Sequence, residues 1–353
     1  MTAVTATPGL DRPITLNDVA AYAGVSSATV SRVLAGNYPV KAATRQRVLR
    51  AVRDLNYVVN THARALAGVK TETIAFFLND VRSPAFAEAA YGVEREAASR
   101  GKLCLLGCTH EDAARELAFV KLMREQQAAA VILIGGIVDD EGYRARMIEI
   151  AHSLRAAGSQ LVLCGRPPLG EDVPAIVVEY DNEAGAYAAT SHLLSRGHRR
   201  ILYLSGQVAH TTSAGRVSGY LRALADFGVP EDPALVEHGE FSRQSGYELA
   251  RRRLSRDRDF TAVCTGTDQM AAGVLDALDE AGLRVPQDVS LVGYDDVQLA
   301  RDLRPQLTTV HVPYEELGRT AVRLALDGGR AVRRAVLGTH VVVRGSVSRL
   351  VQR

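Results

Sequence analysis

Basic side chains crowd the first 70 residues of this 353-residue chain. The segment carries nine Lys and Arg residues against three Asp residues, a net charge of +6, whereas the remainder has a net charge of −4. Guanidinium and ammonium groups bind phosphate, so a cationic segment attached to a slightly acidic body attracts a polyanion to one end of the molecule. The charge distribution therefore predicts a nucleic-acid partner for the N-terminal segment.

A second set of chemically capable side chains follows apolar, strand-like runs further along the chain. It combines aromatic rings, cations, a carboxylate and neutral polar groups: Asn79, Ser83, Phe86, Arg166, Arg216, Phe241, Thr267 and Asp295. Parallel sheets bind ligands beyond the carboxyl ends of their strands, and this mixture suits a polyhydroxylated small molecule. Simpler roles compete: an Arg is often solvated, a Phe is often in the core, and Asp268 is best interpreted as a helix cap.

Residues that could catalyse a reaction are not grouped in any usual signature. The sequence contains no phosphate-binding Gly-rich loop, dinucleotide fingerprint, zinc-protease motif or nucleophile elbow. Cys104, Cys108 and His110 share one face of a predicted strand, where buried thiols are favoured over a zinc site. All four cysteines lie in apolar runs typical of reduced, buried thiols, so we expect neither a disulfide scaffold nor a metal or other cofactor.

Short helices position the basic residues. Thr15 with Asp18 forms a capping-box pattern before a helix that Gly24 ends, and Ser26 caps a second helix with Val30 and Val33 on its buried face. A third helix follows through residues 45–55, and Asn60 begins a short helical pattern ending before Gly68. Two short helices around a glycine turn predict a helix-turn-helix, whose second helix enters the DNA major groove. An ordinary three-helix bundle is the alternative.

From residue 73 onward, apolar runs alternate with amphipathic helices, which predicts an α/β fold with doubly wound parallel sheets. The predicted strands cover residues 74–78, 103–108, 130–134, 161–164, 176–178, 201–204, 262–265 and 289–292. About 280 residues exceed what a single core usually supports, so two lobes are expected. The longest apolar stretch has 11 residues, far below the roughly 18 that cross a bilayer, and residues 1–11 resemble no export signal. We therefore expect no membrane association and a cytoplasmic location.

Several motifs resemble those of the lactose/galactose repressor family of bacterial transcription regulators. They are the runs 15–20, 23–26, 29–34 and 55–57 with Asn60 in the headpiece, and 181–182, 197–198, 219–220, 285–286, 292–296 and 307–310 with Arg216, Asp268 and 272–273 in the body. The resemblance covers nearly the whole chain from Arg12. It implies a helix-turn-helix headpiece, a hinge helix and a two-lobed effector domain of the periplasmic-binding-protein type.

The resemblance assigns DNA contacts to named residues. The base-reading positions correspond to Ser27, Ala28 and Arg32, of which only Arg32 can grip a guanine edge. The remaining candidate DNA contacts are Thr15, Ser26, Thr29, Ser31, Asn37, Thr44, Asn60, Ala63, Arg64 and Leu66. Leu66 would wedge into a central base step from the minor groove, unless it merely packs as a linker residue. For Ser26, helix capping is favoured over DNA contact.

The same resemblance sets the expected organisation and partners. The expected parts are a disordered leader (1–11), the headpiece (12–59), a hinge helix and linker (60–70) and an effector domain (71–353). Its N-lobe is expected at about 71–166 and 297–325, and its C-lobe at about 167–296 and 326–353. Thr267 replaces the Asn usual in the family, which leaves the sugar unspecified. A homodimer on a pseudo-palindromic double-stranded operator, controlled by a sugar-like effector, is the predicted function; an α/β enzyme or a solute-binding protein is the alternative.

Overall fold

The computed structural model describes residues 14–35, 39–57, 73–327 and 333–350. The chain divides into two compact units, residues 1–71 and 72–353, each of which is described by itself. The predicted leader (1–11), Asn37 and the predicted hinge (60–70), with Asn60, Ala63, Arg64 and Leu66, lie outside the described residues. Those predictions therefore stay predictions.

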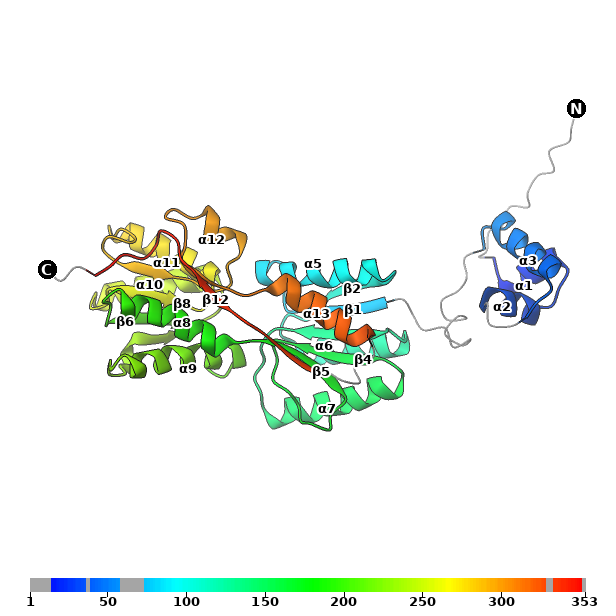
Figure 1. Cartoon of the computed structure of the whole chain (residues 1–353), viewed down its shortest axis with the longest axis horizontal. Helices are drawn as coiled ribbons and strands as arrows, with labels where there is room; N and C mark the ends of the chain where they lie inside the picture. The colour runs from blue at the N-terminus through cyan, green and yellow to red at the C-terminus, as the bar shows by residue number, and fades with distance from the viewer. Residues whose placement is uncertain (1–13, 36–38, 58–72, 328–332, 351–353) are drawn as a thin grey trace, which may run out of the picture. The chain divides into compact units, whose positions relative to one another are not determined.

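The described residues of the first unit, 14–35 and 39–57, form three helices, α1 (Leu16–Ala23), α2 (Ser27–Ala35) and α3 (Ala42–Asp54) (Figure 1). The capping box forms as predicted, because Thr15 N–H donates to the Asp18 carboxylate at 2.8 Å while Asp18 N–H donates to the Thr15 hydroxyl at 3.4 Å. Gly24 ends α1 at a φ of 63°, which only glycine adopts without strain. Val19, Val30 and Val48, one from each helix, are fully buried and form the centre of a small core.

The N-lobe of the second unit is built on a six-stranded parallel sheet in the order β11-β5-β4-β3-β1-β2. Its strands are β1 (Thr73–Leu78), β2 (Leu103–Cys108), β3 (Ala130–Ile134), β4 (Gln160–Cys164), β5 (Ala175–Tyr180) and β11 (Arg334–Leu337). Alternate residues of β1 point to opposite faces of the sheet. Ile74 and Phe76 pack against α5 (Pro84–Ser99) and α13 (Tyr314–Leu326) on one face. Ala75 and Phe77 pack against α6 (Ala113–Glu125) and α7 (Glu141–Ala156) on the other. Both faces of the sheet are thus covered.

The C-lobe contains a four-stranded parallel sheet in the order β7-β6-β8-β9. Its strands are β6 (Ile201–Ser205), β7 (Val236–His238), β8 (Ala262–Thr265) and β9 (Ser290–Val292). The helices α8 (Asn182–Ser195) and α9 (Thr211–Asp226) cover one face, and α10 (Arg243–Arg256) and α11 (Asp268–Glu280) cover the other. The short helix α12 (Gln298–Asp302) and an antiparallel pair, β10 (Thr309–His311) with β12 (His340–Val342), complete this lobe.

The predicted lobe limits were wrong for three segments. Strand β5 pairs with β4, and β11 pairs with β5, so residues 175–180 and 334–337 belong to the N-lobe sheet rather than to the C-lobe. Residues 297–311 lie with the C-lobe, because Ala300 and Leu307 are buried in its core and Thr308 is bridged to Val292. The chain therefore passes between the lobes three times, at residues 180–182, 311–314 and 337–340.

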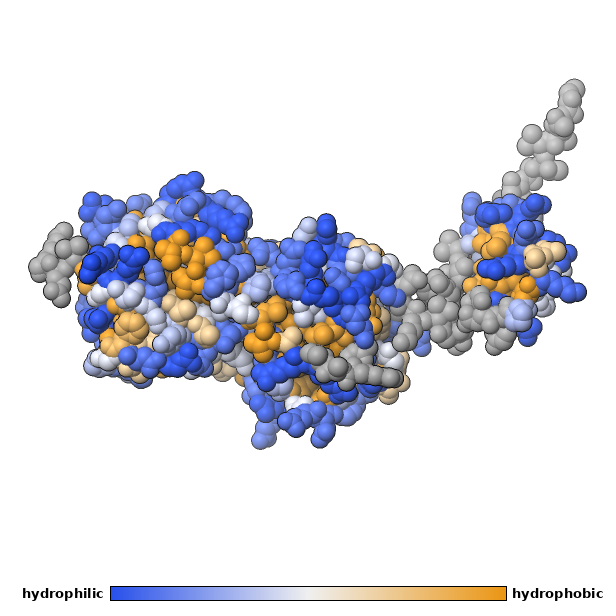
Figure 2. Space-filling model, viewed as in Figure 1, coloured by the Kyte–Doolittle hydropathy of each residue, from blue (hydrophilic) through white to orange (hydrophobic). Residues whose placement is uncertain are grey.

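The cysteines differ from the prediction in part. Cys164 and Cys264 are buried, and burial raises the pKa of each thiol to about 12 despite nearby groups that lower it. Cys104 and Cys108 are only partly buried, because β2 is an edge strand and leaves Leu103 66% exposed. No helix of the described residues is both long and apolar enough to cross a membrane. On the face of the second unit drawn in Figure 2, hydrophilic residues predominate and apolar ones gather in separate patches.

Candidate functional site

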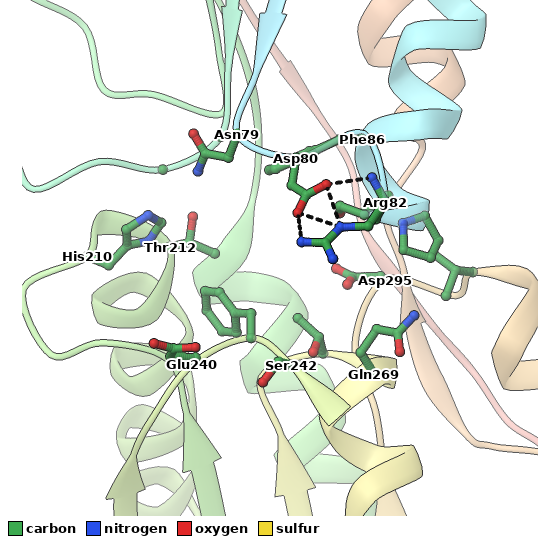
Figure 3. Close-up of a pocket in the computed structure, with 18 of the residues that line it drawn as sticks. Asn79, Asp80, Arg82, Phe86, His210, Thr212, Glu240, Ser242, Gln269 and Asp295 are labelled. Atoms are coloured by element: carbon green, nitrogen blue, oxygen red, sulfur yellow. Dashed lines mark hydrogen bonds and ion pairs between the residues drawn. The ribbon is translucent and has the colours of Figure 1, made fainter. Parts of the chain in front are cut away.

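A cavity of about 500 Å³ lies between the two lobes of the second unit (Figure 3). Its walls are the segments that follow the carboxyl ends of the strands: Asn79–Phe86 after β1, His110 and Glu111 after β2, and Gly135 and Gly136 after β3 in the N-lobe; Gln207 after β6, Glu240–Ser242 after β7 and Thr267 after β8 in the C-lobe. The parallel topology of both sheets brings these ends together across the gap. The site is therefore positioned by the feature from which the sequence analysis predicted it.

Seven of the eight predicted effector-binding residues line this cavity: Asn79, Ser83, Phe86, Arg216, Phe241, Thr267 and Asp295. Phe86 lies against Gly135, where an added Cβ would approach the Phe86 ring to 3.0 Å, and Phe241 lies edge-on to His210 with a centroid distance of 6.1 Å. Aromatic surface and polar groups thus face the same space. That these residues contact an effector remains a prediction.

Arg166 does not line the cavity, although it follows β4 as predicted. Its side chain is 3% exposed and turns back into the N-lobe, where it forms an ion pair with Glu116 at 2.8 Å. Its Nε atom donates to the carbonyl oxygen of Gly135 at 3.1 Å. Burial alone would lower the pKa of Arg166, but Glu116 and Tyr143 raise it above the usual value. Arg166 is a positioning residue that holds the Gly135 segment of the cavity wall.

Arg216 and Asp295 form the charged centre of the site. The guanidinium of Arg216, on α9, donates to Asp295 at 3.4 Å and to the Asn182 side chain at 2.8 Å, and it also bonds the Gly266 carbonyl oxygen. It lies 3.7 Å from the centre of the Tyr294 ring, which is a cation–π arrangement. The Tyr314 hydroxyl, from the N-lobe helix α13, donates to the same Asp295 carboxylate at 2.8 Å. Asp295 therefore connects both lobes.

The electrostatics of Asp295 follow from its burial. Burial raises the pKa of this carboxyl group, and Arg216 and the Tyr314 hydroxyl partly oppose that rise, leaving the pKa at about 6. Asp295 is therefore largely ionised at pH 7 and becomes protonated in mildly acidic solution. Arg216 keeps its charge, because Asp295 and three tyrosines outweigh the cost of burying it.

The helix cap predicted at Asp268 lies at its neighbour, Thr267. Thr267 is the N-cap of α11, since its hydroxyl accepts from Met270 N–H at 3.2 Å, so the cap is Thr267 and not Asp268 as predicted. Asp268 is fully buried within the C-lobe, where its carboxylate accepts from the Thr309 hydroxyl at 2.5 Å and from Val297 N–H at 3.0 Å. The amide-to-hydroxyl change at Thr267 thus keeps a helix cap that also faces the cavity.

The lobes also touch directly, on residues 136–138 and 210–211, which we term the interlobe clasp. Thr211 N–H donates to the Ile137 carbonyl oxygen at 2.9 Å, and Ile137 N–H donates to the Thr211 hydroxyl at 3.1 Å. Val138 and His210 form an antiparallel bridge beside them. His210 and Gly136 belong to both the clasp and the cavity wall. A bound molecule can therefore influence how firmly the lobes hold each other.

Sequence reasoning missed most of the polar lining. The missed polar residues are Asp80, Arg82, His110, Glu111, Tyr180, Gln207, His210, Thr212, Glu240, Ser242, Gln269 and Tyr314. Asp80 and Arg82 lie inside the run 79–86 that was singled out, and Gln269 lies two residues after Thr267, so their positions carried a signal. His110, Gln207 and Glu240 follow strands β2, β6 and β7 in the same way. The strand-end rule applied to every strand would have found them.

The candidate DNA-contacting residues of the first unit lie on and around α2. Ala28 and Arg32 are exposed and one helical turn apart, so they share a face, whereas Ser27, Thr29, Ser31 and Thr44 are half-buried. Two exposed candidates have structural roles: the Thr15 side chain belongs to the capping box, and the Ser26 hydroxyl accepts from Thr29 N–H at 3.3 Å. Ser27 donates to the Asn17 side chain at 2.6 Å. Their contacts with DNA remain predictions.

Comparisons with known proteins identify both units. Residues 15–60 match the model for "Bacterial regulatory proteins, lacI family", and residues 190–347 match that for a "Periplasmic binding protein-like domain". The chain is 33% identical over 312 residues to catabolite control protein A of Priestia megaterium, covering 88% of this chain and 91% of that protein. It is 35% identical to the transcriptional regulator GalR of Escherichia coli K12, covering 88% of each chain.

The chain belongs to the LacI family of bacterial regulatory proteins. Solved structures agree: the Lac repressor dimer bound to operator and the anti-inducer ONPF aligns with a TM-score of 0.79 at 27% identity, covering 96% of this chain and all of that one. The complex of the transcriptional regulator CelR with cellobiose aligns with a TM-score of 0.70 at 33% identity, covering 95% of this chain and all of that one. The predicted LacI/GalR family and its fold, a helix-turn-helix unit with a periplasmic-binding-protein-like domain, are confirmed.

Proposed function

We propose that this LacI-family regulator is a repressor whose affinity for a DNA operator is set by a sugar-like effector in the interlobe cavity. The observation that carries the proposal is the cavity itself, in which ring faces of Phe86 and Phe241 lie beside the Arg216–Asp295 pair. Aromatic faces cover the apolar side of a sugar ring, and carboxylates and amides bind its hydroxyls. Support also comes from CelR, whose structure was solved as a cellobiose complex.

The DNA contacts are assigned to α2 of the first unit. Arg32 lies on an exposed face of α2, one turn after Ala28. Its guanidinium group binds a guanine edge while Ala28 contacts a thymine methyl group. The basic face of α3, with Arg47, Arg50 and Arg53 exposed, supplies phosphate contacts. Base readout then depends mainly on one side chain, and much of the affinity is electrostatic.

The functional form is a homodimer. The edge strand β2 exposes Leu103, Leu105 and Leu106, at 66%, 39% and 42%, and nearby α6 exposes Leu122 at 46%. An apolar sheet edge of this kind pairs with a partner, and a second copy of the chain supplies the same surface by two-fold symmetry. A symmetric dimer presents two copies of α2, which matches a pseudo-palindromic double-stranded operator.

Regulation follows as a shift between two populations. Effector binding between the lobes changes the balance of open and closed cavities, and in a dimer this alters the spacing of the two segments 60–70 that precede the effector domains. The protein acts in the cytoplasm, where its operator is, and uses no cofactor and catalyses no reaction. The direction of the response, induction or corepression, depends on which population the effector favours.

The proposal is tested by selecting genomic DNA fragments with the full-length protein and then titrating the selected fragment with and without candidate sugars. Arg32→Ala should weaken binding to the selected fragment by about 1–3 kcal/mol while leaving the fold intact. Arg146→Ala is the matched control, because Arg146 is an exposed arginine on α7 of the second unit. Equal binding to selected and random duplex at every sugar concentration would refute the proposal.

A further inference from the structure

Carboxylates outnumber cations along the cavity wall. The charged lining residues are Asp80, Glu111, Glu240 and Asp295 against Arg82 and Arg216, a net charge of −2. Burial lowers the pKa of His210, so this imidazole adds no positive charge at neutral pH, and even a protonated His110 would leave the total negative. An anionic ligand entering this space therefore meets an unfavourable potential.

The two cations are already engaged by the protein. Arg82 donates to the Asp80 carboxylate through Nε at 2.9 Å and through Nη2 at 2.5 Å. Figure 3 shows this ion pair at the cavity wall. The three guanidinium nitrogen atoms of Arg216 donate hydrogen bonds to Asn182, Gly266 and Asp295. Glu111 accepts one bond from Asn79 at 3.3 Å, and within the described part of the chain no hydrogen bond or ion pair occupies the Glu240 carboxylate. Acceptors thus remain free while the buried Arg216 guanidinium is fully used; Arg82, which is 87% exposed, is held by a surface ion pair only.

Helix N-termini, the other usual anion-binding elements, differ in how far the protein itself occupies them. Six helices of the described residues begin at the cavity: α5, α9, α10, α11, α12 with its N-cap Val297, and α13 with its first residue Tyr314. Helix α13 carries Glu315 and Glu316 in its first turn, and these carboxylates disfavour an anion there. Helices α5 and α9 have no side-chain cap, although Pro84 of α5 lacks an N–H and the first N–H of α9, from Thr211, donates to Ile137. In α10 and α11, Ser242 and Thr267 accept first-turn N–H groups themselves. These two capped ends offer a phosphate few of the backbone donors that it requires.

We propose that the effector of this cavity is an uncharged polyhydroxylated molecule, and that its phosphorylated or carboxylated counterparts are excluded. Hydroxyl groups both donate and accept hydrogen bonds, so they can satisfy the free carboxylate and amide oxygens, whereas phosphate and carboxylate only accept. The inference rests on the proposed function, because it names the chemical class of the molecule bound at that same site. The inference predicts that the cavity binds free sugars and rejects the corresponding sugar phosphates.

The first test measures binding of matched pairs to the full-length protein by calorimetry: glucose and glucose 6-phosphate, ribose and ribose 5-phosphate, trehalose and trehalose 6-phosphate. For any sugar that binds, the phosphorylated member should bind on the order of tenfold more weakly at low salt. The difference in affinity between the free and the phosphorylated sugar should become smaller with added salt and in the double variant Glu111→Gln, Glu240→Gln. Glu171→Gln, at an exposed site outside the cavity, should leave it unchanged. A phosphorylated member that binds as tightly or more tightly would overturn the inference, as would a difference that neither salt nor the double variant alters.

A second test does not depend on which sugar is the effector. Inorganic phosphate, compared with chloride at equal ionic strength, should give the wild-type protein no saturable thermal stabilisation. A saturable stabilisation that trehalose or another neutral sugar displaces would overturn the inference. If no sugar of any pair binds, the proposed sugar-like effector fails, while this phosphate titration still decides whether the cavity excludes anions.

Discussion

Gly136 is the residue at which a single added methyl group should open the interlobe clasp. A Cβ built on Gly136 would lie 2.4 Å from both the His210 ring and the Thr212 hydroxyl, closer than side-chain carbons approach other atoms in proteins. His210 could rotate, but Thr212 is buried and has little freedom to move. We therefore expect Gly136→Ala to separate segment 136–138 from segment 210–211.

The magnitude follows from the bonds that the clasp contains. Two hydrogen bonds join Ile137 and Thr211, at 2.9 and 3.1 Å, and each contributes about 0.5–1.5 kcal/mol net. Their loss shifts the balance from closed to open by about 1–3 kcal/mol, which is roughly 5- to 150-fold. The lobes themselves should fold normally, because the clasp lies outside both sheets.

Hydrogen exchange of the unliganded protein measures this directly. The amides of Ile137 and Thr211 should lose protection in Gly136→Ala by roughly 5- to 150-fold, while amides of β3 and β6 keep theirs. Gly338→Ala is the matched control, since no atom lies within 4 Å of its added Cβ, and it should exchange like the wild type. Unchanged protection of both clasp amides in Gly136→Ala would refute the reasoning. Any effector that favours the closed state should also bind the variant correspondingly more weakly.

Three further predictions concern the central carboxylate, the predicted hinge and the N-lobe wall. The pKa of Asp295 in the folded protein is about 6, above its ordinary 3.8, so its contribution to the unfolding free energy is fully present below pH 4. That contribution, about 3 kcal/mol, is lost as the pH rises through 6. Urea titrations at a series of pH values should show this loss in the wild type and a smaller one in Asp295→Asn. Protonation of Asp295 should weaken sugar binding, so the affinity should fall from pH 7 to pH 5 in the wild type but not in Asp295→Asn. An equally steep fall in both proteins would contradict this role of Asp295. Leu66→Ala should weaken specific operator binding without unfolding the protein, and an unaltered gel-shift titration would end the wedge hypothesis. Glu116→Gln, which leaves the buried Arg166 guanidinium without its carboxylate, should lower the unfolding free energy by about 3 kcal/mol, and a loss below 1 kcal/mol in urea denaturation would show that the pair does not hold the wall.

The sequence pattern predicted elements better than it predicted which elements belong together. All eight predicted strands form, because each is an apolar run between helix signals. The error lay in assigning β5 to the C-lobe: its residues follow β4 along the chain, and no local feature says where the chain changes lobes. That position depends on pairing with β4 on one side and with the distant β11 on the other. The strands β7, β10, β11 and β12 were not predicted: each has three or four residues and includes a His, Thr, Glu or Arg, whereas the equally short β9 lies in the mostly apolar run 289–292.

The difference between Arg166 and Arg216 shows where sequence reasoning about the site reaches its limit. Arg166 follows a strand and Arg216 lies on a helix, yet only Arg216 reaches the cavity. The direction of each guanidinium is set by a carboxylate far away in the sequence, Glu116 for one and Asp295 for the other. A buried arginine extends to where its charge is matched, and that partner is fixed only by the fold. The rule that ligands bind at strand ends locates a site, whereas the pairing of buried charges decides which side chains remain to meet the ligand.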